Sequence, residues 1–289
     1  MTMGYFGSPE NKAIANIERE ISKKQLDAVY EKADGKIKDE QINPDDFADI
    51  VGKEKISKDK KYVENMESVF AKEADPNQEE SRKLATILEA VLHEHSELSE
   101  WLGPNSFTAK ASRYDDIKNG VDTIAEFEDE DSGKIEVLAI DITTSQDLSK
   151  KIGRIKKEIE SGEMAKIDYF SSQHTDTRQS LKNIPRIIIG ADKRTVSEIG
   201  NLWVKGENNA LGEHNIQFQI IEEMILQCVK FKEYAEKFGK SDIASKYQKL
   251  NEILRKVYDE KKSGGVEDDH ERDRDRVFAE LKKEISEIS

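Results

Sequence analysis

The sequence predicts a mixed fold, α/β (α+β), in which a small mixed β-sheet core is flanked by helices and extended by helices at both the N- and C-terminal ends. The middle of the chain contains short alternating or β-branched apolar segments, whereas the first and last thirds repeat apolar residues every three or four positions. Charged residues make up 37% of the chain, above an average of about 25%, which suits long exposed helices around a modest core. The 289 residues suffice for one sizeable core with such additions.

Residues 1–76 are expected to form a helical N-terminal arm, either mobile or docked on the core. Its first helix should cover 10–33 and end at Asp34-Gly35, with an apolar face made of Ile14, Ile17, Ile21 and Val29. The arm should continue with a helix start at Asn43-Pro44, a helix over 58–73 and a break at Asp75-Pro76-Asn77.

Residues 77–205 are expected to form the core. Its predicted elements, in order, are a helix over 78–101, strands over 107–114, 121–128 and 135–143, a basic helix over 145–161, a strand over 185–190 and a helix from about 195. The first helix carries an apolar stripe of Leu84, Leu88, Val91, His95 and Leu98. Turn residues at 118–120 and 129–134 make the second and third strands an antiparallel hairpin.

The C-terminal part should be helical. Residues 206–262 read as a helical hairpin with wide apolar faces, and Cys228 on one of these faces is expected to serve packing. Residues 263–289 read as a Ser-Gly-Gly linker followed by a charged tail, in which Val277, Leu281 and Ile285 could form a short amphipathic helix. Trp101 and Trp203 are expected to anchor the core.

Composition restricts the partners and the location. No run of about 18 apolar residues exists, so no membrane span is expected, and the first residues lack the pattern of a secretory signal. A single cysteine fits a reducing, cytoplasmic location. The net charge of -14 argues against a general nucleic-acid binder, but 145–205 contains 12 Lys/Arg against 8 Asp/Glu. That local excess is compatible with a nucleic-acid partner and also with chance.

Two carboxylates stand at neighbouring ends of the predicted hairpin. Asp122 begins one strand, and Asp141 lies near the end of the next, after four apolar residues. Desolvating such a carboxylate costs several kcal/mol unless it is paired, solvated or bound to metal. Two converging acids repel each other, and a divalent cation relieves that repulsion. Mg²⁺ suits a site with few protein carboxylates, hard oxygen ligands and remaining waters. The alternative is a turn acid and a strand-end cap in an ordinary hairpin.

The segments Tyr114-Asp115-Asp116, Asn119-Gly120-Val121-Asp122 and Asp141-Ile142-Thr143 lie within a helix-β-β-β-helix-β order. This pattern, over about 78–200, resembles the PD-(D/E)xK nuclease superfamily and its restriction-endonuclease-like fold. The resemblance implies that Asp122, Asp141 and the main-chain carbonyl of Ile142 bind Mg²⁺ or Mn²⁺. It also implies a supporting Glu on the preceding helix, for which Glu89 is best placed and Glu94 is the alternative.

Thr143 occupies the position of the family's lysine and cannot supply a cation beside the attacking water. Lys151, or its neighbour Lys150, could replace that lysine from the following helix, and Gln146 could orient water instead. Lys150, Lys151, Arg154, Lys156 and Lys157 could contact phosphate or simply form a solvated helix face.

The resemblance implies a metal-dependent nuclease that hydrolyses phosphodiester bonds, with DNA a better candidate than RNA. Because of Thr143 and the net charge, the alternative is a catalytically inactive nuclease-like domain that binds nucleic acid or a protein. A third reading is a helical interaction protein that self-associates through its arms.

Overall fold

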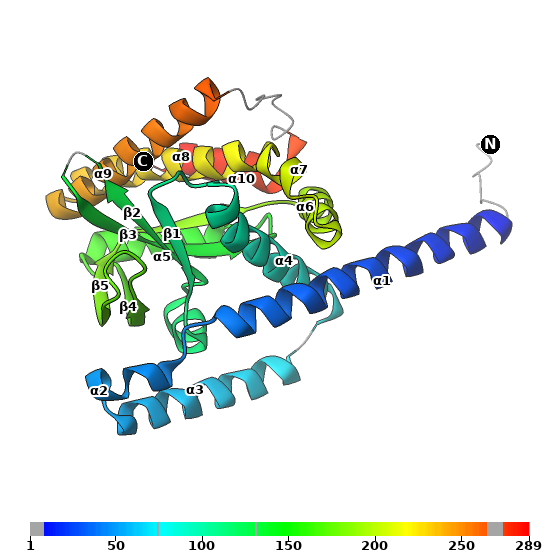
Figure 1. Ribbon diagram of the computed structural model, residues 1–289, viewed down its shortest axis with the longest axis horizontal. Coiled ribbons are helices and arrows are strands. Elements are labelled where there is room, and N and C mark those ends of the chain that lie inside the picture. The colour runs from blue at the N-terminus through cyan, green and yellow to red at the C-terminus, as the bar shows by residue number, and fades with distance from the viewer. Residues whose placement is uncertain (1–8, 74, 131, 265–273, 289) are drawn as a thin grey trace.

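A four-stranded mixed sheet forms the centre of the molecule in the computed structural model, which describes residues 9–73, 75–130, 132–264 and 274–288 (Figure 1). The strand order is β1-β2-β3-β6. The strands are β1 (Ser106–Lys110), β2 (Thr123–Asp129), β3 (Lys134–Thr143) and β6 (Arg186–Gly190). The pairs β1–β2 and β2–β3 are antiparallel, and β6 runs parallel to β3. The predicted mixed sheet flanked by helices is therefore confirmed.

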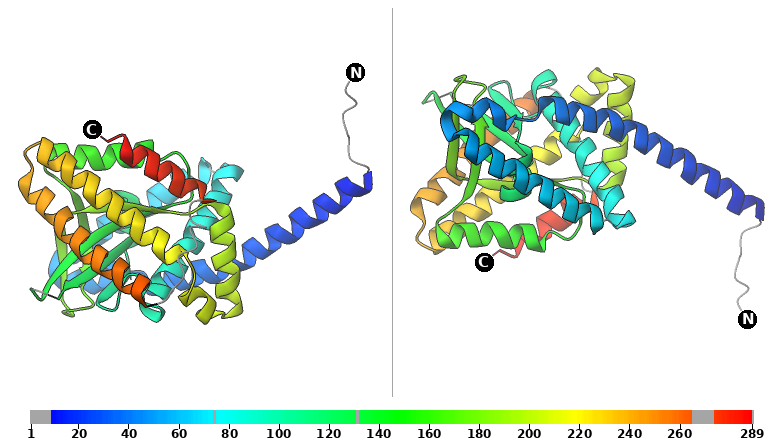
Figure 2. Two further views of the ribbon diagram at one scale, coloured as in Figure 1. Left: turned by 90° about the horizontal axis from the view of Figure 1, so that it is seen from above. Right: turned by 90° about the horizontal axis from the view of Figure 1, so that it is seen from below.

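Helices cover both sides of this sheet. Figure 2 shows the C-terminal helices on one side and the N-terminal helices on the other. The helices after the arm are α4 (Pro76–Leu98), α5 (Ser149–Ser161), α6 (Lys193–Lys205), α7 (Asn208–Gly212), α8 (Ile216–Lys237), α9 (Ser241–Ser263) and α10 (Arg276–Ser286). The α4 stripe is buried from Leu84 to His95, but Leu98 is 62% exposed because the helix ends there.

A two-stranded hairpin, β4 (Ala165–Ser171) and β5 (Arg178–Ile184), follows α5 and precedes β6 in the sequence. It was not predicted. Most of β4 is buried, whereas β5 is exposed along most of its length. An exposed strand carries no apolar alternation, so β5 left no periodic signal in the sequence.

The N-terminal arm is partly docked. Helix α1 (Pro9–Glu40) does not end at Asp34-Gly35, because Val29, Ala33 and Ile37 are buried in the core and carry the helix across that point. The side chains of Ile14, Ile17 and Ile21 lie outside the described residues. In Figure 1 the first half of α1 extends away from the other elements.

The chain after α1 turns back against the hairpin. As predicted, Asn43 caps a helix start, accepting a hydrogen bond from the Asp45 amide at 3.1 Å. The elements that follow are η1 (Pro44–Phe47), α2 (Ala48–Val51) and α3 (Lys53–Lys72). Tyr169 of β4 donates a hydrogen bond to Asp59 of α3 at 2.7 Å and meets the Phe47 ring edge-on, which fixes this part of the arm.

The C-terminal helices complete the core. Helices α8 and α9 form the predicted hairpin, and Val277, Leu281 and Ile285 of α10 are buried. Cys228, Trp101 and Trp203 are buried as expected. The predicted linker at 263–265 reaches Gly265, which lies outside the described residues, as does Asp131 of the predicted turn at 129–134.

The outer edge of β6 is closed by side chains instead of another strand. Gln227 of α8 accepts from the Ile188 amide at 2.8 Å and donates to the Ile188 carbonyl at 2.6 Å. Glu223 accepts a hydrogen bond from the Gly190 amide at 3.0 Å, and Gln219 donates one to the Gly190 carbonyl at 2.9 Å. The Tyr247 hydroxyl of α9 accepts a hydrogen bond from the Arg186 amide at 3.3 Å and donates one to the Arg186 carbonyl at 3.0 Å. Alternate residues of this edge therefore have both main-chain groups paired.

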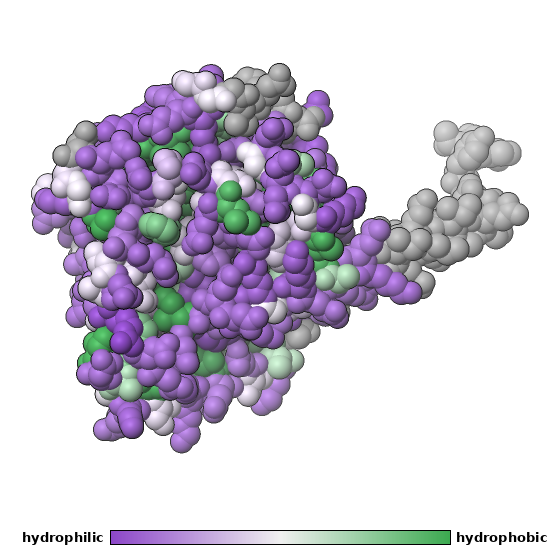
Figure 3. Space-filling model, viewed as in Figure 1, coloured by the Kyte–Doolittle hydropathy of each residue, from purple (hydrophilic) through white to green (hydrophobic). Residues whose placement is uncertain are grey.

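The molecular face in Figure 3 is mostly hydrophilic, with apolar residues scattered among polar ones. Among the described residues, no helix combines the length and the apolar character that crossing a membrane requires.

Candidate functional site

Asp122 and Asp141 lie close together where β2 begins and β3 ends, and the charge of Asp141 acts on Asp122. The paired register ends with Thr123 opposite Ile140, and the Asp122 amide donates a hydrogen bond to the Ile140 carbonyl at 2.9 Å, so Asp122 lies one residue beyond the paired segment. The Ile142 amide donates a hydrogen bond to the Asp122 carboxylate at 2.6 Å. Asp141 is buried and Asp122 is half-buried. The structure thus brings together the two acids that the sequence singled out.

The turn before Asp122 is held in place by buried polar contacts. Asp115, in the short π-helix η2 (Asp115–Asn119), accepts hydrogen bonds from the Asp168 and Tyr169 amides at 2.7 and 3.1 Å. Gly120 then adopts φ 62°, a conformation that favours glycine. Arg186 donates to the carbonyls of Asn119 and Gly120. Asp115, the first acid of the Tyr114-Asp115-Asp116 segment, therefore stabilises the loop before Asp122.

The surroundings of Asp122 raise the pKa of its carboxyl. Desolvation raises the pKa of the Asp122 carboxyl well above its usual range, and the charges of Asp141, Asp116 and Glu89 raise it further. Asp122 therefore lies among acids that disfavour its ionised form.

Glu89 belongs to this group, and its partner is a residue that the sequence did not single out. Lys110, at the end of β1, is 3% exposed and donates to Glu89 Oε1 at 2.5 Å and to the Asp122 carbonyl at 3.0 Å. Burial alone would lower the pKa of Lys110, but the charges of Glu89, Asp116 and Asp122 raise it. Glu94, the alternative to Glu89, lies instead 3.1 Å from Lys36 of α1 and outside the site.

Lys151 reaches the site from α5. Its ammonium contacts Asp141 Oδ1 and lies 3.5 Å from the Ile142 carbonyl. Lys150 and Gln146 are exposed. Thr143 is uncharged and cannot replace the missing cation; its hydroxyl accepts a hydrogen bond from the Ser145 amide at 3.1 Å. Lys151 is thus the candidate that the structure places beside the acids.

Few oxygen atoms at this site could bind a divalent cation. No group of three or more His, Cys, Asp or Glu side chains within the described ranges is arranged to hold a metal ion. The protein ligands of an ion here would be the Asp122 and Asp141 carboxylates and the Ile142 carbonyl alone, and Mg²⁺ is the cation that tolerates so few because it keeps several waters. The Lys151 ammonium already lies beside two of these three groups, so the site accommodates positive charge there.

The raised pKa of Asp122 predicts a gain in stability from Asp122→Asn in metal-free protein. The native state binds more protons than the unfolded chain between the unfolded and folded pKa values, so the stability contributed by Asp122 falls as pH rises through that window. Asparagine removes the charge, and its amide oxygen can still accept from Ile142. Urea unfolding in EDTA, from pH 4 to pH 8, should show a higher free energy of unfolding for the variant at the upper end. Asp39→Asn, at an exposed position, is the control. A loss of stability at pH 8 would contradict this prediction.

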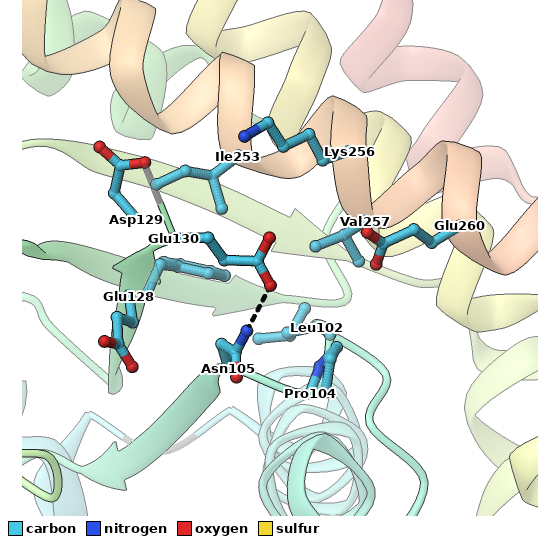
Figure 4. Close-up of a pocket in the computed structure, with 12 residues that line it drawn as sticks. Leu102, Pro104, Asn105, Glu128, Asp129, Glu130, Ile253, Lys256, Val257 and Glu260 are labelled. Atoms are coloured by element: carbon cyan, nitrogen blue, oxygen red, sulfur yellow. Dashed lines mark hydrogen bonds between the residues drawn. The ribbon is translucent and has the colours of Figure 1, made fainter. Parts of the chain in front are cut away.

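A separate hollow of about 30 Å³ lies at the far end of β2, between the loop after α4 and helix α9 (Figure 4). Leu102, Ile253 and Val257 line it, together with Glu130, which accepts a hydrogen bond from Asn105 at 2.7 Å. It is about the size of one water molecule and contains none of the residues above.

Comparison with models of known protein families, with curated proteins and with solved structures finds no match to this chain.

Proposed function

We propose that this protein hydrolyses phosphodiester bonds in DNA with the help of a divalent cation, Mg²⁺ or Mn²⁺. The observation that carries the proposal is the proximity of two carboxylates at the ends of β2 and β3: Asp141 is buried, and desolvation and the charge of Asp141 together raise the pKa of Asp122. Keeping two such acids together costs free energy, which the Lys151 ammonium offsets at Asp141, and perturbed acids of this kind are common at functional sites.

The side chains around the two acids have separable roles. Asp122, Asp141 and the Ile142 carbonyl would hold the cation. When bound, the cation supplies Lewis-acid polarisation of the phosphate and a more acidic water. Glu89, held by Lys110 and Thr123, is placed to orient a water molecule.

Lys151 differs from Lys110 in its access to solvent. The Lys151 side chain is 29% exposed, whereas that of Lys110 is 3% exposed. Lys151 can therefore turn toward a phosphate group at the surface and neutralise its charge, whereas Lys110 can only stabilise the site from within.

The test is DNA cleavage by purified protein with Mg²⁺ or Mn²⁺, against an EDTA control. Asp141→Asn should reduce the rate by at least about 100-fold, because losing even an outer partner of a metal ligand costs about 10- to 100-fold. Asp39→Asn is the matched control, since it makes the same chemical change at an exposed position. Calorimetry should show Mg²⁺ binding by the wild type and a large loss of binding in Asp141→Asn. Failure of the wild type to bind either cation would refute the metal site.

A second candidate is a domain of the same fold that binds nucleic acid, or a protein partner, without cutting. It is supported by the internal partners of all three acids: Lys110 for Glu89, Lys151 for Asp141 and the Ile142 amide for Asp122. Thr143 at the lysine position favours it as well. Salt-sensitive DNA binding without metal-dependent cleavage would support this alternative.

A further inference from the structure

The outward face of α5 carries three cations in a row. Lys150, Arg154 and Lys157 are exposed and are spaced four and three residues apart, so they lie along one side of the helix. Within the residues that the structure describes, none of the three forms an ion pair. Three exposed cations in a row stand out in a protein whose net charge is -14, although hydrogen bonds from Ser149 and the charge of Lys150 lower the pKa of the exposed Asp147 carboxyl.

This row adjoins the candidate site. Lys151, next to Lys150, contacts Asp141. Arg154 lies over the turn before Asp122, because a Cβ placed on Gly120 would clash with its guanidinium group. The three cations also line a shallow hollow whose lining includes Glu158 and Glu163. Glu158 is neutralised by Arg186 at 3.1 Å, so the hollow keeps a positive balance.

Gly153 lies in the middle of the same row. Glycine is among the least favourable residues inside a helix, yet a Cβ at Gly153 would have nothing within 4 Å. Packing within the protein therefore does not require glycine here. Glycine also serves where another molecule approaches a backbone closely.

We propose that the outward face of α5 binds the sugar-phosphate backbone of a DNA strand, which Lys150, Arg154 and Lys157 neutralise and which Gly153 allows to come close. The residues lining the hollow are polar, charged or glycine, and so lack the apolar anchors of a protein interface. From Lys150 to Lys157 the helix rises about 10 Å, which corresponds to about three base-pair steps of duplex DNA, since each strand carries one phosphate per about 3.4 Å of duplex axis. The inference rests on the proposed function and names the surface that holds its substrate.

The first experiment measures the salt dependence of binding to a labelled 20-base-pair duplex in EDTA, which prevents cutting. Replacing Lys150, Arg154 and Lys157 by Ala should reduce the slope of log K against log [KCl] by about 2.7, since each phosphate contact contributes about 0.9. Replacing Lys72, Lys205 and Lys262 by Ala is the control, because it removes three exposed charges from other helices. The control should leave the slope within about 0.5 of the wild type.

The second experiment changes shape without changing charge. Gly153→Leu should weaken duplex binding at least tenfold and leave the salt slope unchanged. Gly35→Leu is the matched control, because Gly35 also lies in a helix with nothing within 4 Å of its added Cβ. The melting temperatures of both variants should stay at or above that of the wild type.

The outcomes separate the two proposals. If the wild type cuts DNA but the triple variant keeps the wild-type slope, the α5 surface is refuted and the cleavage proposal stands. If the wild type binds DNA without cutting it and the triple variant has the reduced slope, the surface stands and the cleavage proposal is refuted. If the wild type neither binds nor cuts duplex or single-stranded DNA at 50 mM KCl, both are refuted. Two results together support the α5 surface. The salt slope falls in the triple variant but not in its lysine control, and duplex binding weakens in Gly153→Leu but not in Gly35→Leu.

Discussion

Lys110→Met should lower the free energy of unfolding by about 3–5 kcal/mol, the usual cost of removing one partner of a buried ion pair. The substitution keeps an apolar side chain of similar length but leaves the Glu89 carboxylate buried with only the Thr123 hydroxyl, at 3.3 Å. It also removes the donor to the Asp122 carbonyl. Urea unfolding at pH 7, followed by circular dichroism, measures the effect.

Two further variants test whether loss of the buried ion pair causes this effect. The double variant with Lys110→Met and Glu89→Leu should recover most of the loss, because replacing both partners by apolar groups is often neutral. Lys193→Met breaks an exposed ion pair, in which the Lys193 side chain is 66% exposed and the Glu80 side chain 46% exposed. It should lower the free energy of unfolding by only about 0–1 kcal/mol. A double variant no more stable than the single one would show that the ion pair is not the cause.

Gln227→Leu should lower the free energy of unfolding by about 2–6 kcal/mol. Leucine fills a similar volume but leaves the buried amide and carbonyl of Ile188 without partners, at about 1–3 kcal/mol each. Denaturant unfolding measures the total, and hydrogen exchange should show faster exchange of the Ile188 amide.

Gln248→Leu in α9 is the matched control, because Gln248 donates only to Glu252 at the surface. It should change stability by no more than about 0.5 kcal/mol. If Gln227→Leu proved equally mild, the side chain would not be what satisfies the edge of β6.

The central hairpin could be predicted because two independent signals agree there. Turn residues at 118–120 and 129–134 delimit the strands, and apolar residues lie between them. In an antiparallel pair these limits also fix the register, so the strand ends that carry Asp122 and Asp141 are neighbours. The proximity of the two acids could therefore be predicted from local sequence, whereas the hydrogen bond from the Asp122 amide to the Ile140 carbonyl could not.

Lys110 and β5 could not be predicted, for opposite reasons. A lysine at the end of a strand reads as solvated, and its burial depends on Glu89, which is 21 residues away on another element. Most residues of β5 are exposed, so the strand has no alternation of apolar and polar residues that could identify it in the sequence. Helix α1 is a third case, because core contacts of Val29, Ala33 and Ile37 outweigh the local stop signal at Asp34-Gly35. For Lys110 and α1, contacts that are distant in the sequence decide, whereas in β5 exposure removes the apolar pattern.

The side-chain closure of β6 has a consequence for the order in which the chain can complete its fold. The groups that pair with this edge lie 29 to 61 residues further along the sequence. On the ribosome, β6 therefore emerges well before Gln219, Gln227 and Tyr247. Until they arrive, its main chain is open to pairing with any other extended strand. Synthesis of α8 and α9 thus ends a period in which the nascent sheet is vulnerable to misassembly.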